Sequence, residues 1–138
     1  MPRFRLLAHT ADVGFEAFGR TQGELFANSA HALMDLIVDC RSIQPVNQVP
    51  IEVRGADRES LLVNWLSEIL FQHDAEKWVF RKFEIRNLTD RTLLAAAIGE
   101  KFDGARHRIN VMVKAITYHQ LLIEKTPHGW RAQVYVDI

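Results

Sequence analysis

The stretch that decides the fold is Val13-Gly14-Phe15-Glu16-Ala17-Phe18-Gly19, together with the segment that follows it, Thr21 to Asp39. The first alternates like a strand, and the second has helical periodicity. The apolar residues that share one face of the second segment are Phe26, Ala30, Leu33 and Ile37. Thr21 and Glu24 have the spacing of a capping box, which satisfies amides at a helix start. The sequence therefore predicts a strand and then a helix over about residues 22 to 38.

A second unit of the same kind lies 36 residues further along the chain. Residues 49–55 alternate and end in glycine, and Asp57 is a suitable N-cap for a helix that ends near His73 or Asp74. Its apolar stripe consists of Leu62, Trp65, Leu66, Ile69 and Leu70. The residues that coincide after the shift are Val13 with Val49, Glu16 with Glu52, Gly19 with Gly55, Leu25 with Leu61, and Asn28 with Asn64. An internal strand–helix repeat and the general similarity of amphipathic units both explain this pattern.

The second half of the chain is predicted to be rich in strands. Extended patterns cover residues 78–88 and 92–102, although Leu93 to Ala97 also has the propensity of a helix. A clean alternation covers 109–118, and Pro127-His128-Gly129 is a turn before a last strand, 130–137. We therefore expect one α+β domain, residues 1–138, with two helices packed on a mostly antiparallel or mixed sheet assembly.

Charge and cysteine content narrow the classes of function. Lys plus Arg and Asp plus Glu number 17 each, so the chain lacks the positive field that holds nucleic acid, and we expect no stable direct RNA binding. Short basic groups such as Arg81-Lys82 and 106–108 are typical of solvated charges. The single Cys40 makes no internal disulfide, and we find no signal peptide or membrane span. The expected location is the cytoplasm.

No catalytic constellation is visible in the sequence. No histidine lies near Cys40 in the sequence at a spacing that would suggest a general base for the thiol. The glycines are too isolated to form a phosphate-binding loop. The six histidines include no pair with zinc-ligand spacing. We therefore expect a protein that is not itself an enzyme. A metal-dependent hydrolase remains a weaker reading, because spacing identifies no general base.

Carboxylates are the more promising chemical groups. Asp12 begins the first alternating strand on the same face as Glu16, and Asp137 lies beside the terminal carboxylate on Ile138. If these strand ends meet, they form an oxygen-rich site suited to Ca²⁺, Mg²⁺ or Mn²⁺. The alternative is that both aspartates are ordinary solvated residues.

Three motifs make the chain resemble the archease family over nearly its full length. They are His9-Thr10-Ala11-Asp12-Val13-Gly14, the segment Val113 to His119, and Asp137-Ile138. The resemblance implies an activator of an RtcB-type RNA ligase, which joins RNA ends in tRNA splicing and RNA repair with GTP and Mn²⁺. The activator would promote guanylylation and multiple turnover of the ligase. The family has also been connected with a chaperone or specificity role for an RNA-modifying enzyme, such as a tRNA methyltransferase.

The resemblance also assigns residues. Asp12, Asp137 and the main-chain oxygen of Ile138 would bind a divalent cation, calcium in relatives, and Lys114 would serve activation. Further support for the site could come from His9, Glu16 and His119. Many relatives carry an acidic residue immediately before the first motif, where this chain has Ala8. The charge of the cation site is expected to be lower here for that reason.

Overall fold

The computed structural model describes residues 3–8 and 12–138. Its elements, in chain order, are β1 (Phe4–Ala8), β2 (Val13–Gly19), α1 (Gln22–Ile37), the 3-10 helix η1 (Cys40–Ser42), β3 (Asn47–Arg54), α2 (Arg58–Asp74), β4 (Trp78–Leu88), β5 (Thr92–Lys101), β6 (Ala115–Ile116), β7 (Leu122–Thr126) and β8 (Gly129–Asp137).

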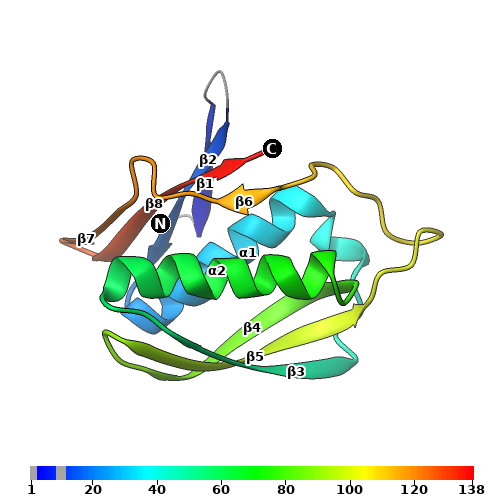
Figure 1. Ribbon diagram of the computed structural model, residues 1–138, viewed down its shortest axis with the longest axis horizontal. Helices are drawn as coiled ribbons and strands as arrows, with labels where there is room; N and C mark the ends of the chain where they lie inside the picture. The colour runs from blue at the N-terminus through cyan, green and yellow to red at the C-terminus, as the bar shows by residue number, and fades with distance from the viewer. Residues whose placement is uncertain (1–2, 9–11) are drawn as a thin grey trace.

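Two antiparallel sheets enclose the two helices (Figure 1). One sheet has five strands in the order β1-β2-β8-β6, with β7 also paired to β8, and the other has three in the order β3-β5-β4. Helix α1 contacts β2 of the first sheet and β4 of the second. The predicted α+β single domain is confirmed, and every strand pairing of the named elements is antiparallel.

Side-chain caps start both helices where the sequence predicts. The Glu24 amide donates to Thr21 Oγ1 at 3.1 Å, ahead of α1. Ahead of α2, the Ser60 amide donates to Asp57 Oδ1 at 2.8 Å and the Asp57 amide donates to Ser60 Oγ at 3.1 Å. These bonds satisfy amides that the first helical turn leaves without partners. Both predicted helices are confirmed, and their ends agree within one residue.

Each of the two strand–helix units contains an equivalent hydrogen bond, which joins the helix to the strand of the same unit. Asn28 Nδ2 donates to the Phe18 carbonyl at 2.7 Å, and Asn64 Nδ2 donates to the Arg54 carbonyl at 2.7 Å. Donor and acceptor are each shifted by the same 36 positions. Amphipathic periodicity alone does not require this bond, so the contact favours a true internal repeat.

The glycine that closes each strand is also used in the same way. A Cβ on Gly19 would lie 2.4 Å from the Leu25 amide nitrogen, and one on Gly55 would lie 2.5 Å from that of Leu61. Both glycines therefore let the strand end approach the backbone of the following helix. The strands of the two units, β2 and β3, belong to different sheets.

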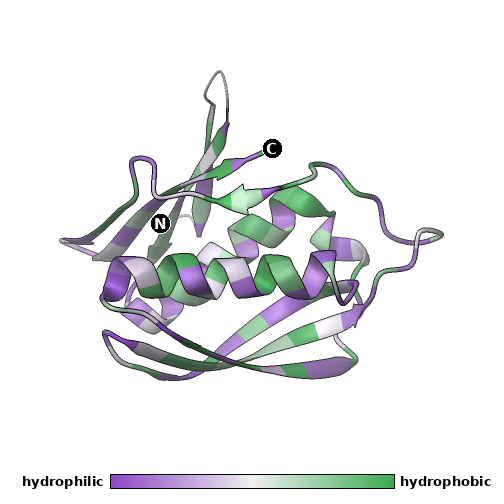
Figure 2. Ribbon diagram, viewed as in Figure 1, coloured by the Kyte–Doolittle hydropathy of each residue, from purple (hydrophilic) through white to green (hydrophobic). Residues whose placement is uncertain are grey.

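The core lies between the sheets, around the helices. Trp65 is fully buried, and its Nε1 donates to the Phe26 carbonyl at 2.9 Å, which joins α2 to α1. Figure 2 shows hydrophobic and hydrophilic residues alternating along both helices and along the strands, as expected for elements with one buried face. Among the described residues, neither helix is long and apolar enough to cross a membrane.

The predicted strand over residues 109–118 is wrong for most of its length. Only Ala115–Ile116 form a strand, and Ile109 makes a single bridge to Val38. The reason is that β7 pairs with β8 from Gly129 to Gln133, which leaves β6 only the last part of that edge. Leu93 to Ala97, by contrast, is strand and not helix, because it is the middle of the three-stranded sheet.

Burial of His31 on α1 makes stability depend on pH. Desolvation, and then the charges of Arg3 and Arg81, lower the pKa of His31 from 6.5 to about 4. The pKa of His31 is lower in the folded state than in the unfolded state, so protons bind the unfolded chain more readily. The folded state is therefore not penalised by this group above pH 6.5 and loses stability as pH falls from 6.5 toward 4. We expect the free energy of unfolding to fall by about 2 kcal/mol between pH 7 and pH 5 from this group.

Chemical denaturation at both pH values checks the effect. His31→Gln should lose less stability than the wild type over this interval. His128→Gln, in the exposed β7–β8 turn, is the control and should keep the wild-type slope. An unchanged pH slope in His31→Gln would contradict the assignment.

Candidate functional site

Strand pairing brings Asp12 and Asp137 to the same end of the five-stranded sheet. β2 and β8 pair antiparallel, with Val13 opposite Val136 at this end. Asp12 precedes that pair by one residue and Asp137 follows it, so continuing the register sets them opposite each other. Opposite residues project from the same face, with Cβ atoms about 4.5–5.5 Å apart. The Asp12 Oδ1 atom is buried, while Asp137 is exposed.

The face that carries these carboxylates is the one that points away from the helices. Along β2 and β8, Phe15, Val134 and Val136 are fully buried in the core. Side chains alternate along a strand, so the residues between them face the opposite way. Asp12 and Asp137 therefore lie at the end of the sheet on the face opposite the core, with Asp137 exposed and Asp12 partly buried.

Lys114 and Asp137 are joined by a main-chain hydrogen bond. The Lys114 amide donates to the Asp137 carbonyl at 2.8 Å, immediately before Ala115 pairs with Asp137 in the sheet. Lys114 and Ile138 also line a groove of about 770 Å³ beside α2. Apolar residues that line the same groove are Phe102, Ile109, Val111, Met112 and Val113. Met112 exposes 80% of its surface, so the carboxylate end of the sheet adjoins an open apolar groove.

The three supporting residues have different positions. Glu16 lies within the sheet, where its carboxylate forms ion pairs with Arg5 at 2.8 Å and with Arg131 at 3.6 Å. The structure does not bring Glu16 to the Asp12–Asp137 end, because it stands four residues along an extended strand. His119 does lie near this end, with its ring 5.7 Å from that of Tyr135. His9 lies outside the described residues.

The donors at this end of the sheet determine which ions they could hold. In the part of the chain that is described, no group of three or more His, Cys, Asp or Glu side chains could hold a metal ion. Two carboxylates and a main-chain oxygen are nevertheless ligands that hard cations accept, and the remaining coordination positions can be filled by water. The residues fit Ca²⁺, Mg²⁺ or Mn²⁺ and do not fit structural zinc.

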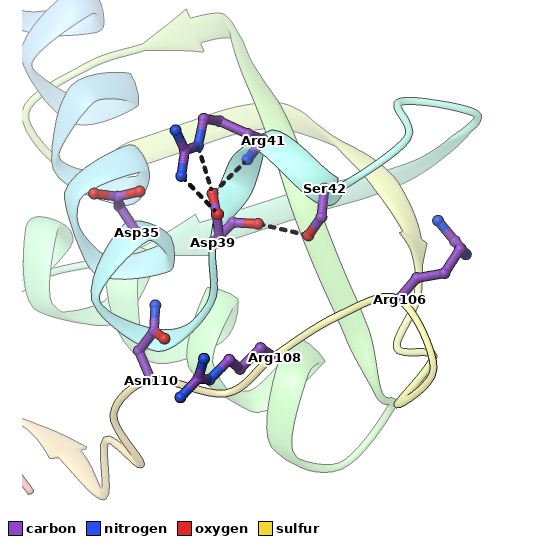
Figure 3. A pocket seen from close by; sticks show the side chains of 7 residues that line it. All are labelled: Asp35, Asp39, Arg41, Ser42, Arg106, Arg108 and Asn110. Carbon is purple, nitrogen blue, oxygen red and sulfur yellow. Dashed lines mark hydrogen bonds and ion pairs between the residues drawn. The ribbon is translucent and has the colours of Figure 1, made fainter.

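A second cavity, of about 540 Å³, lies near the C-terminal end of α1 (Figure 3). It is lined by both signs of charge, including Asp35, Asp39, Arg41, Arg106 and Arg108. Figure 3 shows Asp39 bonded to Arg41 and Ser42. Arg106 forms an ion pair with Glu100 outside this set. The guanidiniums of Arg41 and Arg106 are thus paired within the protein, and the carboxylates of Asp35 and Asp39 line the same cavity, which makes it a poor anion site.

Neighbouring groups support a structural function for this region. Burial, and then the charge of Asp35, raise the pKa of the Cys40 thiol to about 12, so it stays protonated and is no nucleophile. Hydrogen bonds from Arg106, opposed by burial and aided by the Gln44 amide, lower the pKa of Glu100 to about 2. His107 Nε2 also lies 3.0 Å from Glu100 Oε2. This bonded cluster fixes the loop that leads to residues 108–114.

Sequence reasoning missed Tyr135 at the site. Tyr135 is paired with Gly14 across β2 and β8, and its exposed fraction is only 7%. The available signal was the glycine inside a strand, which often marks a close approach by another group.

These observations define the class: a one-domain α+β protein with two helices between two antiparallel sheets. The model of the archease protein family (MTH1598/TM1083) matches residues 4–138. The chain belongs to the archease family. Protein archease of Pyrococcus abyssi is 44% identical over 142 residues, which cover 100% of both chains. Protein archease of Methanosarcina barkeri is 41% identical over 140 residues, 99% of this chain and 96% of that one.

Two solved structures share the fold. The solution structure of Methanobacterium thermoautotrophicum protein 1598 is 31% identical, with a TM-score of 0.82 over 100% of both chains. The crystal structure of an archease from Thermotoga maritima, described as a possible chaperone, has a TM-score of 0.64. It is 18% identical and covers 96% of this chain and 94% of that one, so it supports the fold alone.

Proposed function

We propose that this archease activates an RtcB-type RNA ligase by presenting a divalent cation at the end of its five-stranded sheet. The observation that supports the proposal is the β2–β8 register, which pairs Val13 with Val136 and, continued by one residue, would set Asp12 opposite Asp137. The Lys114 amide is bonded to the Asp137 carbonyl, so three residues named by the family resemblance would lie together at this end of the sheet. The protein itself forms no phosphodiester bond and acts through its partner.

The carboxylates of Asp12 and Asp137 and the main-chain oxygen of Ile138 would hold the cation, with calcium as the leading candidate. A bound cation of this kind supplies positive charge that a partner's carboxylate or phosphate oxygens can share. Because so few protein ligands take part, coordination positions stay accessible to the partner. Ala8 in place of an acidic residue is expected to weaken affinity, because it leaves one negative charge fewer.

The direct test uses an RtcB-type ligase from the same cell, with GTP, Mn²⁺ and an RNA that has joinable ends. The purified archease should raise multiple-turnover ligation and the yield of guanylylated ligase. The archease alone should ligate nothing. If an authentic partner ligase gains neither turnover nor guanylylation, the proposed activation is wrong.

Lys114→Met should show how much the charge of the lysine contributes to stimulation, independently of cation binding. Methionine keeps the unbranched apolar stem, and the main-chain bond to Asp137 does not use the side chain. We expect stimulation to fall about tenfold, equivalent to about 1.4 kcal/mol of lost interaction with an acidic or phosphate group. Ligation assays and calcium titration measure the two properties separately.

Lys125→Met on β7 is the control for Lys114→Met, since it removes an exposed lysine from the strand that pairs with the other end of β8, away from Asp137. It should leave stimulation unchanged. Equal stimulation by Lys114→Met and the wild type would show that the charge of Lys114 has no role in activation.

A chaperone or specificity role for an RNA-modifying enzyme, such as a tRNA methyltransferase, is the second candidate. The apolar groove with exposed Met112 favours it, and so does the description of the Thermotoga maritima relative. This role predicts that aggregation of the partner enzyme is suppressed even when Asp12 and Asp137 are both replaced. Loss of protection in that double variant would argue against it.

A further inference from the structure

Tyr135 occupies the space that Gly14 leaves open beside the two aspartates. A Cβ on Gly14 would lie 2.7 Å from Tyr135 Cε1 and 2.8 Å from Cδ1, closer than carbon atoms approach. The tyrosine ring therefore lies across the backbone of β2. Gly14 and Tyr135 are directly paired, one pair beyond Val13 and Val136. On the outer face, this pair is the next one after Asp12 and Asp137.

Neighbouring segments hold Tyr135 in this position. The Thr117 amide and Thr117 Oγ1 both donate to the Tyr135 carbonyl, at 3.1 Å and 2.9 Å. The His119 ring meets the Tyr135 ring edge-on, at 5.7 Å between centroids and 64° between planes. The ring is thus fixed from the β6 side by a turn and from the β2 side by bare glycine backbone.

Packing of the main core does not explain this arrangement. Tyr135 is 7% exposed but lies on the outer face, whereas its neighbours Val134 and Val136 belong to the core cluster. An aromatic ring over a cross-strand glycine supplies the packing that the glycine lacks and fixes the local strand register. Here the strand so fixed is β2, which begins one residue after Asp12.

We infer that Tyr135, seated on Gly14, is a positioning residue that sets the spacing of the Asp12 and Asp137 carboxylates. The inference rests on the proposed cation site and adds to it a determinant of affinity. Without the ring, the end of β2 loses its cover at Gly14, two residues from Asp12, and the carboxylate pair becomes less ordered. Groups that orient metal ligands affect affinity by about 10–100-fold when they are lost.

The test measures calcium affinity by isothermal titration of CaCl₂ into the purified protein, together with the melting temperature without metal. Tyr135→Phe keeps the ring over Gly14 and should bind calcium within about twofold of the wild type. Tyr135→Val should bind about tenfold more weakly. Val134→Ala, on the same strand but on the core face, is the matched control: it should lower the melting temperature and leave calcium affinity unchanged.

A double variant separates positioning from simple packing. Gly14→Ala should be destabilised by collision with the ring, and adding Tyr135→Val should recover the melting temperature by removing that collision. Calcium affinity should stay low in the double variant, because the ring is absent. Recovery of wild-type affinity would overturn the inference.

Two further outcomes also overturn the inference, and they can be told apart. If the wild type binds calcium and Tyr135→Val binds it equally well, the cation site stands and the positioning role is wrong. If the wild type binds no calcium, the cation site itself is wrong and the positioning role is lost with it. The ligation assay, which needs no calcium titration, reports separately on activation.

Discussion

Asp137→Asn is expected to abolish the stimulation of an RtcB-type ligase and to weaken calcium binding at least tenfold. The substitution keeps the shape of the side chain and the main-chain carbonyl that accepts from Lys114, so the sheet edge should stay intact. What is lost is one of two negative charges on a hard cation, for which an amide oxygen is a weaker ligand. Asp12→Asn should have the same two effects. Multiple-turnover ligation and calcium titration measure them.

Glu52→Gln is the matched control for these aspartate variants. It removes one exposed carboxylate from the other sheet, where the Glu52–Arg54 pair is 3.9 Å apart and open to solvent. Such surface pairs contribute about 0–1 kcal/mol, so folding and stimulation should be unaffected. Full stimulation by Asp137→Asn, with its melting temperature preserved, would refute the cation-based mechanism of activation.

Gly19→Ala and Gly55→Ala should each lower the free energy of unfolding by about 2 kcal/mol or more. In both, the new Cβ would meet backbone atoms of Leu25 or Leu61 at 2.4–2.8 Å, and a backbone cannot rotate aside as a side chain does. The strand must then move away from its helix, which strains the Asn28 or Asn64 bond. Denaturant unfolding of each variant gives the loss directly.

Gly23→Ala, inside α1, is the control with the opposite sign. Its Cβ would have no neighbour closer than 3.8 Å, and alanine is favoured over glycine in a helix by about 1 kcal/mol. We expect Gly23→Ala to be as stable as the wild type or more so. Two similar losses at Gly19 and Gly55 would support the internal repeat, whereas a loss at only one would show that the copies have diverged in packing.

Local rules were sufficient to predict the helices and most strands. The spacing of Phe26, Ala30, Leu33 and Ile37 predicts α1, and these residues are all buried in the structure. The 36-residue correspondence aligns Asn28 with Asn64, and the structure gives each of them the same bond to its own strand. In such segments, periodicity and caps agree with the tertiary fold, so the sequence pattern is a reliable guide.

Features that depend on long-range pairing could not be predicted. The alternation of residues 109–118 is typical of a strand, but a strand also needs a neighbour, and β7 already occupies most of the β8 edge. β1 was missed because its five residues, Phe4–Ala8, lack a distinctive pattern. The β2–β8 register, which pairs Val13 with Val136 next to the two aspartates, is also set by long-range pairing that no local pattern reveals.

The central place of β8 in the five-stranded sheet has a consequence for the order of folding. β8 pairs with β2, β6 and β7, yet in the chain it follows all of them. During synthesis, the β1–β2 hairpin must therefore wait for β8 before its open edge is covered, while β3, β4 and β5 can already pair around the helices. Contacts so distant in sequence slow folding and leave a strand edge exposed to aggregation. We expect nascent chains that stop before Gly129 to be substrates for chaperones.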